Sequence, residues 1–287
     1  MNIHSLLSFI PDKPYLNMMY YHYFHSFPKW KQPKTFNEKL QWLKLYDRRP
    51  EYVVMVDKVK AKNYVAERIG EQYIIPTLKV YKDVNEINTN ELPKQFVLKC
   101  NHDSKSVYVC KDKDSFDFQT ALSGLDRGLK RSGFAYGREW PYKNVPRRIL
   151  AEKYLDDNGH VPIDYKVYCF NGNPYKVMLC LDRDKDEDTK FYSFDRNWNL
   201  LRHNKRGKAA PADFTLPKPK NLDKMFEFAA ILSKGIPYLR VDFYEVGEQL
   251  YFGELTLYPD SGFDSAILPE IDRLYGSMIE LPIQKKG

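Results

Sequence analysis

The stretch from Pro237 to Phe263 constrains the fold of this chain more than any other part of the sequence. It contains two runs rich in β-branched and aromatic residues, separated by Gly247, Glu248 and Gln249. This pattern predicts a β-hairpin with a loop of about three residues. The loop length matters because it decides which side chains of the two strands face one another.

A three-residue loop places two acidic side chains opposite each other across the predicted hairpin. Asp242 then faces Glu254, and Arg240 faces Thr256. Directly opposed side chains share one face of a sheet at about 4.5–5.5 Å, so two carboxylates repel each other there. A hard divalent cation such as Mg²⁺ would remove that repulsion, because it prefers carboxylate oxygens. The alternative is a solvated sheet face with a register shifted by one residue, which would send the two carboxylates to opposite faces.

The composition is that of a globular protein with a preference for anionic partners. The chain has 287 residues, 43% of them hydrophobic and 29% charged, and a formal net charge of +7. Such a charge favours nucleotide phosphates, acidic glycans, anionic lipids or nucleic acid. No nucleic-acid-binding motif accompanies it, so we expect no nucleic-acid partner. We find neither a secretion signal nor about 18 consecutive apolar residues, and we expect a cytoplasmic protein without a transmembrane segment.

Helix signals dominate the first 75 residues. Thr35 and Glu38 form a capping box, and Asp57 is expected to cap a second helix that ends at Gly70. Both predicted helices carry several lysines beside their apolar positions. We interpret these lysines as solvated.

A lysine and a polar loop follow the next predicted strand. Residues 95–100 form that strand, Lys99 lies near its end, and residues 101–106 lead into another strand. An ammonium group and the backbone N–H groups of such a loop can both hold phosphate. Glycine is expected in a loop of this kind, and this loop has none. An ordinary polar turn is therefore the alternative.

Two further strands are predicted on either side of Asn171 and Gly172, a pair that strongly favours a hairpin turn. Alternation along the first of them places Asp164, Lys166 and Tyr168 on one face of the sheet.

Four motifs now follow one another along the chain. They are Lys99 with its loop, Glu152-Lys153-Tyr154-Leu155, Asp164-Tyr165-Lys166, and Arg240-Val241-Asp242 with Gly253-Glu254-Leu255-Thr256. In this order they resemble the ATP-grasp superfamily, and most of all its teichuronopeptide-biosynthesis-like (TupA-like) branch. That branch occurs in bacterial capsule and surface-polysaccharide gene sets. The resemblance extends from about Phe36 almost to the end of the chain.

The resemblance implies an α+β protein with the ATP-grasp fold, in which two α+β lobes clasp ATP. A helical segment would occupy residues 1–75. The smaller lobe, with a phosphate flap and a hinge, would span 76–155, and the larger lobe, with the metal site, 156–287.

The resemblance also implies roles for individual residues. The contacts with ATP would come from Lys99, Ser104, Lys105, Ser106, Glu152, Lys153, Tyr154, Leu155, Asp164 and Lys166. Arg240 and Lys166 would act in catalysis on the transferred phosphate. Asp242, Glu254 and Thr256 would bind Mg²⁺. Threonine stands at position 256 where many members of the superfamily have asparagine, and a hydroxyl is a weaker metal ligand than an amide oxygen.

The implied activity is that of an ATP-dependent carboxylate–amine ligase that forms an amide through an acyl phosphate. Its expected partners are ATP with Mg²⁺, an anionic saccharide with a uronic acid carboxylate, and an amino acid or amino alcohol as the amine. A polysaccharide substrate would place the protein in the cytoplasm at the inner face of the membrane, beside a membrane assembly. Three alternatives stay open: a kinase that phosphorylates a sugar hydroxyl, a polysaccharide glycosyltransferase, and a non-catalytic glycan-binding module.

Overall fold

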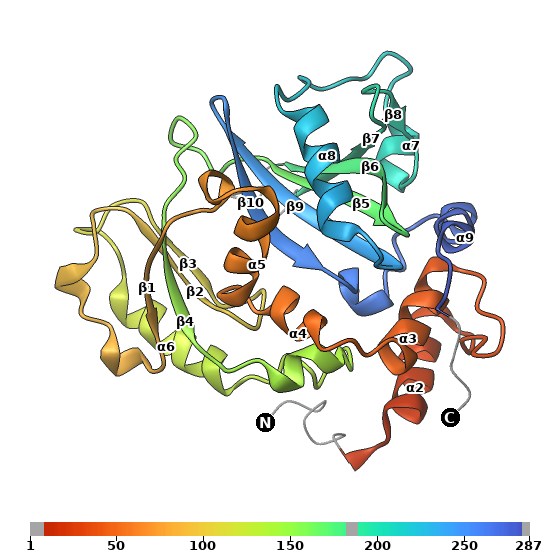
Figure 1. The fold of residues 1–287 in the computed structure, drawn as a ribbon, viewed down its shortest axis with the longest axis horizontal. Coiled ribbons are helices and arrows are strands. Elements are labelled where there is room, and N and C mark those ends of the chain that lie inside the picture. Colours follow the sequence, from red (N-terminus) through yellow and green to blue (C-terminus); the bar gives the residue numbers. More distant parts are fainter. Residues whose placement is uncertain (1–8, 182–188, 283–287) are drawn as a thin grey trace.

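The computed structural model describes residues 9–181 and 189–282 and arranges them as two antiparallel sheets with flanking helices (Figure 1). The helices are α2 (Asp12–Phe24), α3 (Phe36–Tyr46), α4 (Glu51–Val56), α5 (Lys60–Ile69), α6 (Phe118–Lys130), α7 (Lys205–Ala209), α8 (Leu222–Ser233) and α9 (Pro269–Met278). The strands are β1 (Thr77–Tyr81), β2 (Phe96–Cys100), β3 (Val107–Cys110), β4 (Ile149–Lys153), β5 (Asp164–Phe170), β6 (Asn173–Leu181), β7 (Lys190–Phe194), β8 (Leu200–Leu201), β9 (Tyr238–Val246) and β10 (Gln249–Thr256). Among the described helices, none is long and apolar enough to cross a bilayer.

The smaller sheet has the strand order β1-β4-β2-β3 and lies on the left in Figure 1. Along β2, Phe96, Leu98 and Cys100 are fully buried, as alternation on a half-buried strand predicts. They belong to a core that also includes Leu125 of α6. Lys99 alternates to the opposite face of the strand, which leaves its ammonium group available for polar partners.

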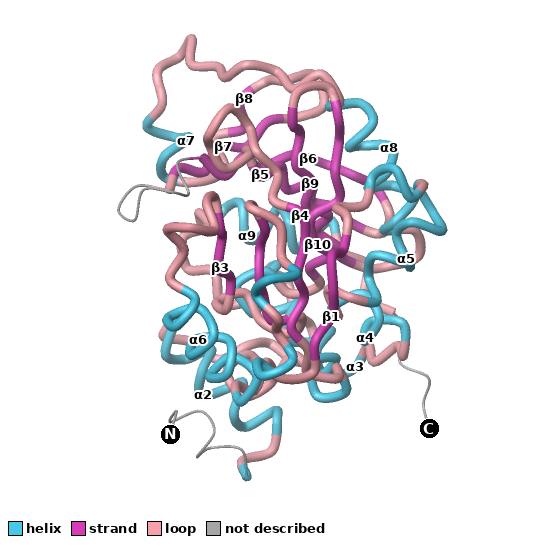
Figure 2. The backbone as a smooth tube through the Cα atoms, turned by 90° about the vertical axis from the view of Figure 1, so that its left-hand side faces the viewer, coloured by secondary structure: helices cyan, strands magenta, loops and turns pink. Residues whose placement is uncertain are grey.

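The larger sheet has the order β10-β9-β5-β6-β7-β8. Its two faces differ in kind. Val167 of β5 and Val241 of β9 are fully buried on the face that helix α8 covers. The intervening residues Lys166 and Asp242 pair across the two strands and therefore lie on the opposite face. Figure 2 shows α5 and α8 on the same side of the strands, and the two helices are in contact.

The β5–β6 connection is the tight turn that the sequence predicts. Asn171 and Gly172 have φ angles of 50° and 82°. Positive φ at both central residues is characteristic of a type I′ hairpin turn, which asparagine and glycine adopt more readily than other residues.

The β9–β10 hairpin departs from the prediction at its tip and agrees with it near the site. Val246 pairs with Gln249, so the loop contains only two residues and the three-residue prediction is wrong. A β-bulge between Phe252 and Glu254 then inserts one extra residue into β10. The bulge restores the expected register beyond it: Glu254 faces Asp242, and in the same register Thr256 faces Arg240. The expected pairing of the two carboxylates is therefore confirmed.

The N-terminal helices pack on the larger sheet and also reach the smaller one. Helix α3 begins with the predicted capping box at Thr35, which is confirmed. The ring of Phe36 packs 4.8 Å from that of Tyr238 on β9, measured between centroids. Helix α5 contacts β10, and its Lys62 donates to Thr77 Oγ1 at the start of β1. The helical segment thus connects the two sheets.

The expected helix start at Asp57 is wrong. Helix α4 ends at Val56, and α5 begins only at Lys60. The Asp57 carboxylate accepts from the backbone N–H of Val59 at 3.0 Å, and it is fully buried. This side chain also has partners outside the helices, described below.

Candidate functional site

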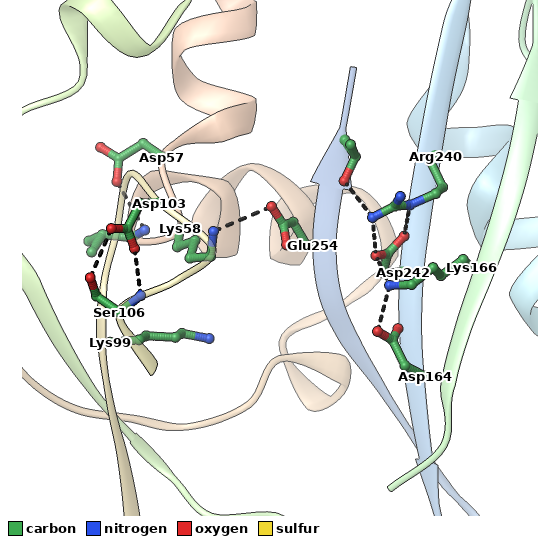
Figure 3. Close-up of polar contacts among 12 residues, drawn as sticks. Asp57, Lys58, Lys99, Asp103, Ser106, Asp164, Lys166, Arg240, Asp242 and Glu254 are labelled. Atoms are coloured by element: carbon green, nitrogen blue, oxygen red, sulfur yellow. Dashed lines mark hydrogen bonds and ion pairs between the residues drawn. The ribbon is translucent and has the colours of Figure 1, made fainter. Parts of the chain in front are cut away.

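Two acidic and two basic side chains meet on the polar face of the larger sheet (Figure 3). Asp242 on β9 accepts two hydrogen bonds of 2.7 Å from the Arg240 guanidinium, one from Nε and one from an Nη. Lys166 on β5 donates to the same carboxylate at 2.6 Å and to Asp164 at 2.5 Å. Strand register explains the contact between strands, because Lys166 and Asp242 are directly paired.

Burial makes this cluster electrostatically strong. Asp242 is only 2% exposed. Burial alone would raise the pKa of the Asp242 carboxyl, but Arg240 and Lys166 hold that pKa below its usual value. Burial likewise acts to lower the pKa of the Lys166 ammonium, and Asp242 raises it above its usual value. Asp242, Lys166 and Arg240 are therefore all charged at neutral pH.

Glu254 faces Asp242 but has a different partner. Lys58, which lies between α4 and α5, places its Nζ 3.3 Å from Glu254 Oε1. Burial opposes ionisation of Glu254, yet Lys58 keeps the pKa of this carboxyl below its usual value despite the neighbouring charge of Asp242. The repulsion expected between the two carboxylates is thus offset by separate cations. Arg240 and Lys166 on the sheet pair with Asp242, and Lys58 on the helical segment pairs with Glu254.

The paired carboxylates suit a divalent cation. A carboxylate has about four lone-pair sites, and the hydrogen bonds from Arg240 and Lys166 to Asp242, with the one contact of Glu254, leave several of these available. Mg²⁺ commonly takes one or two carboxylates and completes its shell with phosphate oxygens and water. Among the described residues no group of three or more acidic, histidine or cysteine side chains could hold a metal. Thr256 Oγ1 lies beside this pair and accepts from Arg240 at 3.1 Å.

A second buried carboxylate lies between two lysines in the smaller sheet. Glu152 on β4 is 3% exposed and forms ion pairs with Lys99 of β2 and with Lys62 of α5, the latter at 2.5 Å. Burial acts to raise the pKa of Glu152, but the two ammonium groups hold it below its usual value. Lys62 also donates to the Ile75 carbonyl at 2.6 Å. Lys99 has no contact of this kind with another residue among those described.

The remaining residues of the predicted hinge follow Glu152 as the chain leaves β4. Lys153 is exposed, Tyr154 is buried, and Leu155 is half-buried. The structure therefore brings Lys99 together with Glu152, while Lys153 ends β4 and the next two residues lie in the segment that follows it.

The loop between β2 and β3 is closed by its own side chains. Asp103 accepts from the backbone N–H of Ser106 at 3.0 Å and from its hydroxyl at 2.8 Å. Arg131 also donates to Asp103, at 2.9 Å. Ser106 is buried by these contacts, whereas Ser104 and Lys105 lie exposed at the tip and have no hydrogen bond or ion pair among the described residues. An aspartate-closed turn thus replaces the glycine-containing loop that phosphate sites commonly use.

The base of this loop is held by a buried network. The Asn101 amide donates to Asp57 at 2.7 Å, and the Arg148 guanidinium donates to the same carboxylate at 2.7 Å. The Asn101 amide oxygen accepts in turn from the Arg148 backbone N–H at 2.8 Å. Because Lys58 follows Asp57 directly, the network fixes the loop, the α4–α5 junction and Lys58 relative to one another.

Sequence reasoning missed Lys58 and Lys62, which it assigned to solvated helix faces. Lys62 carries a signal that could have been used: it shares a helical stripe with the buried residues Val65 and Ile69, at spacings of three and seven. Lys58 lies outside regular helix, and only the folded arrangement brings it to Glu254.

Comparison with known proteins gives one match among families and several among solved structures. A family model described as TupA-like ATPgrasp matches residues 38–280. No curated protein sequence matches this chain. The D-alanine–D-alanine ligase of Bacillus anthracis complexed with ATP is 16% identical over 79% of this chain and 63% of its own, with a TM-score of 0.45. The corresponding ligase of Helicobacter pylori is 14% identical over 86% and 67%, and D-cycloserine synthetase DcsG is 14% identical over 80% and 70%, both with a TM-score of 0.45. The chain thus spans about two thirds of the length of these enzymes.

Proposed function

The chain belongs to the TupA-like ATP-grasp family, and from this premise we propose that it is an ATP-dependent ligase that joins a carboxylate to an amine. The cross-strand pair of Asp242 and Glu254, with Arg240 and Lys166 beside it, is the observation that supports this proposal most. It gathers two metal-binding carboxylates and two cations at one place on the sheet. Such a set suits the transfer of a phosphoryl group, which depends on positioning and charge neutralisation.

The proposed reaction has two steps. An oxygen of the acid substrate's carboxylate attacks the γ-phosphorus of ATP, the bond to the β–γ bridging oxygen breaks, and ADP leaves. The amine nitrogen then attacks the carbonyl carbon of the resulting acyl phosphate, loses a proton, and displaces inorganic phosphate. Neither step needs a protein nucleophile.

Within this reaction we assign the charged side chains as follows. Lys99 binds a phosphate of ATP, because Glu152 is its only ion-pair partner among the residues that the structure describes. Lys58 adds a second cation beside Glu254. Arg240 steadies the γ-phosphate and the acyl phosphate. Lys166, on the neighbouring strand β5, also binds a phosphate of ATP. A Mg²⁺ ion held by Asp242 and Glu254, with Thr256 beside them, would neutralise phosphate charge.

The remaining contacts with ATP are assigned from the family resemblance. Lys153, Tyr154 and Leu155, at and after the end of β4, bind the adenine, and Asp164 binds a ribose hydroxyl. The exposed tip at Ser104 and Lys105 closes over the phosphates. ATP then lies between a lobe of residues 76–155 and a lobe of residues 156–287, with residues 1–75 as the helical segment.

For the substrates we propose a uronic acid carboxylate of a bacterial surface polysaccharide or its precursor, and an amino acid or amino alcohol. The net charge of +7 suits an anionic saccharide. The reaction would take place in the cytoplasm, at the inner face of the membrane.

Trapping of the acyl phosphate tests the ligase chemistry directly. The protein is incubated with ATP, Mg²⁺, sodium D-glucuronate and hydroxylamine, which replaces the amine. We expect ADP and a hydroxamate in equal amounts, detected by the colour of its ferric complex. Phosphate ester on a sugar hydroxyl without hydroxamate would instead identify a kinase. Thermal stabilisation by a UDP-sugar but not by ATP with Mg²⁺ would identify a glycosyltransferase.

A further inference from the structure

Lys176 lies on the same face of the larger sheet as Arg240. Tyr168 on β5 pairs with Arg240 on one side and with Lys176 of β6 on the other. Directly paired residues share a face, so the three side chains form one row across β9, β5 and β6. With strands about 4.8 Å apart, the Cα atoms of Arg240 and Lys176 are separated by roughly 10 Å. Lys176 therefore adds a third strand, β6, to the row of charged residues on this face of the sheet.

The surroundings of Lys176 are unusual for a lysine with 4% exposure. Its Nζ donates to Ser193 Oγ at 3.0 Å, and no other hydrogen bond or ion pair of this ammonium is found among the described residues. The aromatic rings of Tyr168 and Tyr275 lie 4.0 Å and 4.9 Å from Nζ, measured to their centroids. An ammonium group has three donors, so two of them lack an oxygen or nitrogen acceptor among the residues that the structure describes.

Another buried lysine shows what a purely structural ammonium looks like in this protein. Lys44 on α3 is fully buried, and its Nζ donates to Gln41 Oε1 at 2.8 Å and to the carbonyls of Gly137 and Ser261, each at 2.6 Å. All three donors of Lys44 are thus satisfied by the protein. Lys62, Lys99 and Lys166 each contact a carboxylate. Lys176 has neither a full set of hydrogen-bond acceptors nor a carboxylate contact in the described part of the chain.

A buried cation without an anionic partner is costly, because burial removes its hydration. Two aromatic faces and one hydroxyl offset only part of that cost. The arrangement is consistent with a cation that completes its set of contacts when an anion binds.

On the basis of the proposed ligase function, we propose that Lys176, together with Ser193, is the subsite that binds the carboxylate of the acid substrate. Arg240, on the other side of Tyr168, holds the γ-phosphate that this carboxylate attacks. The substrate class that this subsite indicates is a carboxylic acid, and the sugar ring is taken from the proposed function. His203 and Tyr275 lie beside the subsite and are joined by a hydrogen bond of 2.8 Å. Their side chains have to move aside for the acid to enter.

Binding measurements without turnover test this assignment. Isothermal titration of the whole protein with sodium D-glucuronate is carried out in the presence of AMPPNP and Mg²⁺, with D-glucose as the neutral counterpart. We expect the wild type to bind glucuronate and not glucose. Lys176→Met should weaken glucuronate binding at least tenfold, Lys176→Arg should stay within about threefold of the wild type, and the Kd for AMPPNP should change less than twofold in both.

Lys44→Met is the matched control, because it removes another buried ammonium whose partners are all within the protein. It should lower the melting temperature and leave the glucuronate Kd unchanged. Unchanged glucuronate binding in Lys176→Met would overturn the assignment, and so would weaker AMPPNP binding in its place. Absence of glucuronate binding to the wild type would overturn it as well.

The pH dependence gives a second readout. Burial lowers the pKa of Lys176 to about 7, with Asp264 acting to raise it and Arg240 to lower it. The titratable groups that face this ammonium are those of Tyr168, Arg240, His203, Asp264 and Tyr275. Glucuronate should therefore bind best below about pH 7 and more weakly as the pH rises. Lys176→Arg, which stays charged, should lose this dependence; its persistence would overturn the assignment.

The hydroxamate assay separates this proposal from the ligase function. If no hydroxamate forms but glucuronate binding depends on Lys176, the ligase reaction is wrong and the anion subsite stands. If hydroxamate forms with the same KM for glucuronate in wild type and Lys176→Met, the ligase stands and the subsite is wrong.

Discussion

Two buried carboxylates, Asp242 in the larger sheet and Glu152 in the smaller one, are each held between two cations, but by different means. The cations of Asp242 lie on its own strand and on the neighbouring strand, so strand register sets their positions. Glu152 joins Lys99 of the neighbouring strand to Lys62 of helix α5, so it also depends on packing between a helix and a sheet. The first cluster belongs to a single sheet; the second connects separate parts of the chain.

The comparison also separates cations by how completely the protein satisfies them. Lys62 donates to a backbone carbonyl and a hydroxyl in addition to Glu152. Within the described part of the chain, Lys99 pairs with Glu152 alone. We infer that Lys62 stabilises the fold, whereas Lys99 is available to exchange partners with a phosphate.

The largest expected effect is the loss of activity in Asp242→Asn and Glu254→Gln. Each should lower the rate of hydroxamate formation about 100-fold or more, because metal-assisted charge stabilisation contributes several kcal/mol to the transition state. Their stabilities should differ. Asp242→Asn leaves Arg240 and Lys166 without their shared carboxylate and should cost about 3–5 kcal/mol in the free energy of unfolding. Glu254→Gln loses one contact of 3.3 Å and should cost about 1 kcal/mol or less.

Urea denaturation of the two variants at neutral pH checks the stability difference. Equal losses of stability would contradict the view that Asp242 is a structural anion as well as a metal ligand. Full activity in either variant at limiting Mg²⁺ would rule out the metal assignment.

The next effect concerns Lys99 and Lys62, the two lysines on Glu152. Lys99→Met should weaken AMPPNP binding about tenfold to 100-fold, since a hydrogen bond to a charged group contributes about 1.5–3 kcal/mol. Lys62→Met should change that Kd little and should lower the melting temperature more than Lys99→Met does. Titration calorimetry and thermal unfolding measure the two quantities. The reverse ranking would assign the nucleotide contact to Lys62.

A smaller effect is expected at Gly253, the extra residue of the bulge that brings Glu254 opposite Asp242. An added Cβ would lie 3.0 Å from the Tyr244 ring and 3.1 Å from the Asp242 carbonyl oxygen, closer than ordinary contact. Gly253→Ala should cost about 1 kcal/mol in stability, while activity should fall further than that loss explains, because Glu254, a proposed metal ligand, moves relative to Asp242. Gly247→Ala at the turn, where φ is +61°, is the control and should affect stability alone. Similar activities in the two variants would contradict a role for the bulge in positioning the site.

The smallest effect is the pH dependence of stability that Glu152 contributes. Its pKa is lowered in the folded protein, so its contribution is present above the unfolded value of about 4.3 and is lost as the pH falls through the lower folded value. The difference in unfolding free energy between wild type and Glu152→Gln should therefore shrink as the pH falls below about 4.5. Chemical denaturation at a series of pH values measures it. If the difference in unfolding free energy stayed constant with pH, Glu152 would stabilise the fold through its packing rather than through its charge.

The parts of the site that depend on strand pattern were predictable from the sequence. Alternation placed Asp164 and Lys166 on one face, and the hairpin pattern placed Asp242 opposite Glu254, because both depend only on local spacing. The pairing was right although the loop length was wrong, since a bulge compensates for the shorter turn. A period of two residues carries no sign of a bulge, but the isolated glycine at position 253 inside the strand pattern is a signal that could have been used.

The parts that depend on tertiary packing were not predictable. Lys58 reaches Glu254 because the network of Asp57, Asn101 and Arg148 fixes the α4–α5 junction against a loop more than 40 residues further along the chain. Neither charge nor periodicity near Lys58 encodes that contact. Lys176 was likewise not recognisable as a special residue, because its distinguishing property is that no carboxylate of the described residues lies within ion-pair distance of its buried ammonium.

The bulge at Gly253 also makes the tip of the hairpin a suitable place for engineering. Pairing near the site is fixed by β5 on one side and by the bulge on the other, so a change at Gly247 or Glu248 is separated from Asp242 by a segment with its own register. Reporter groups such as a fluorophore on a cysteine at position 248 could therefore be attached without shifting the carboxylates. The distance from such a reporter to the smaller sheet, measured with and without ATP, would test whether the two sheets move relative to each other when nucleotide is added.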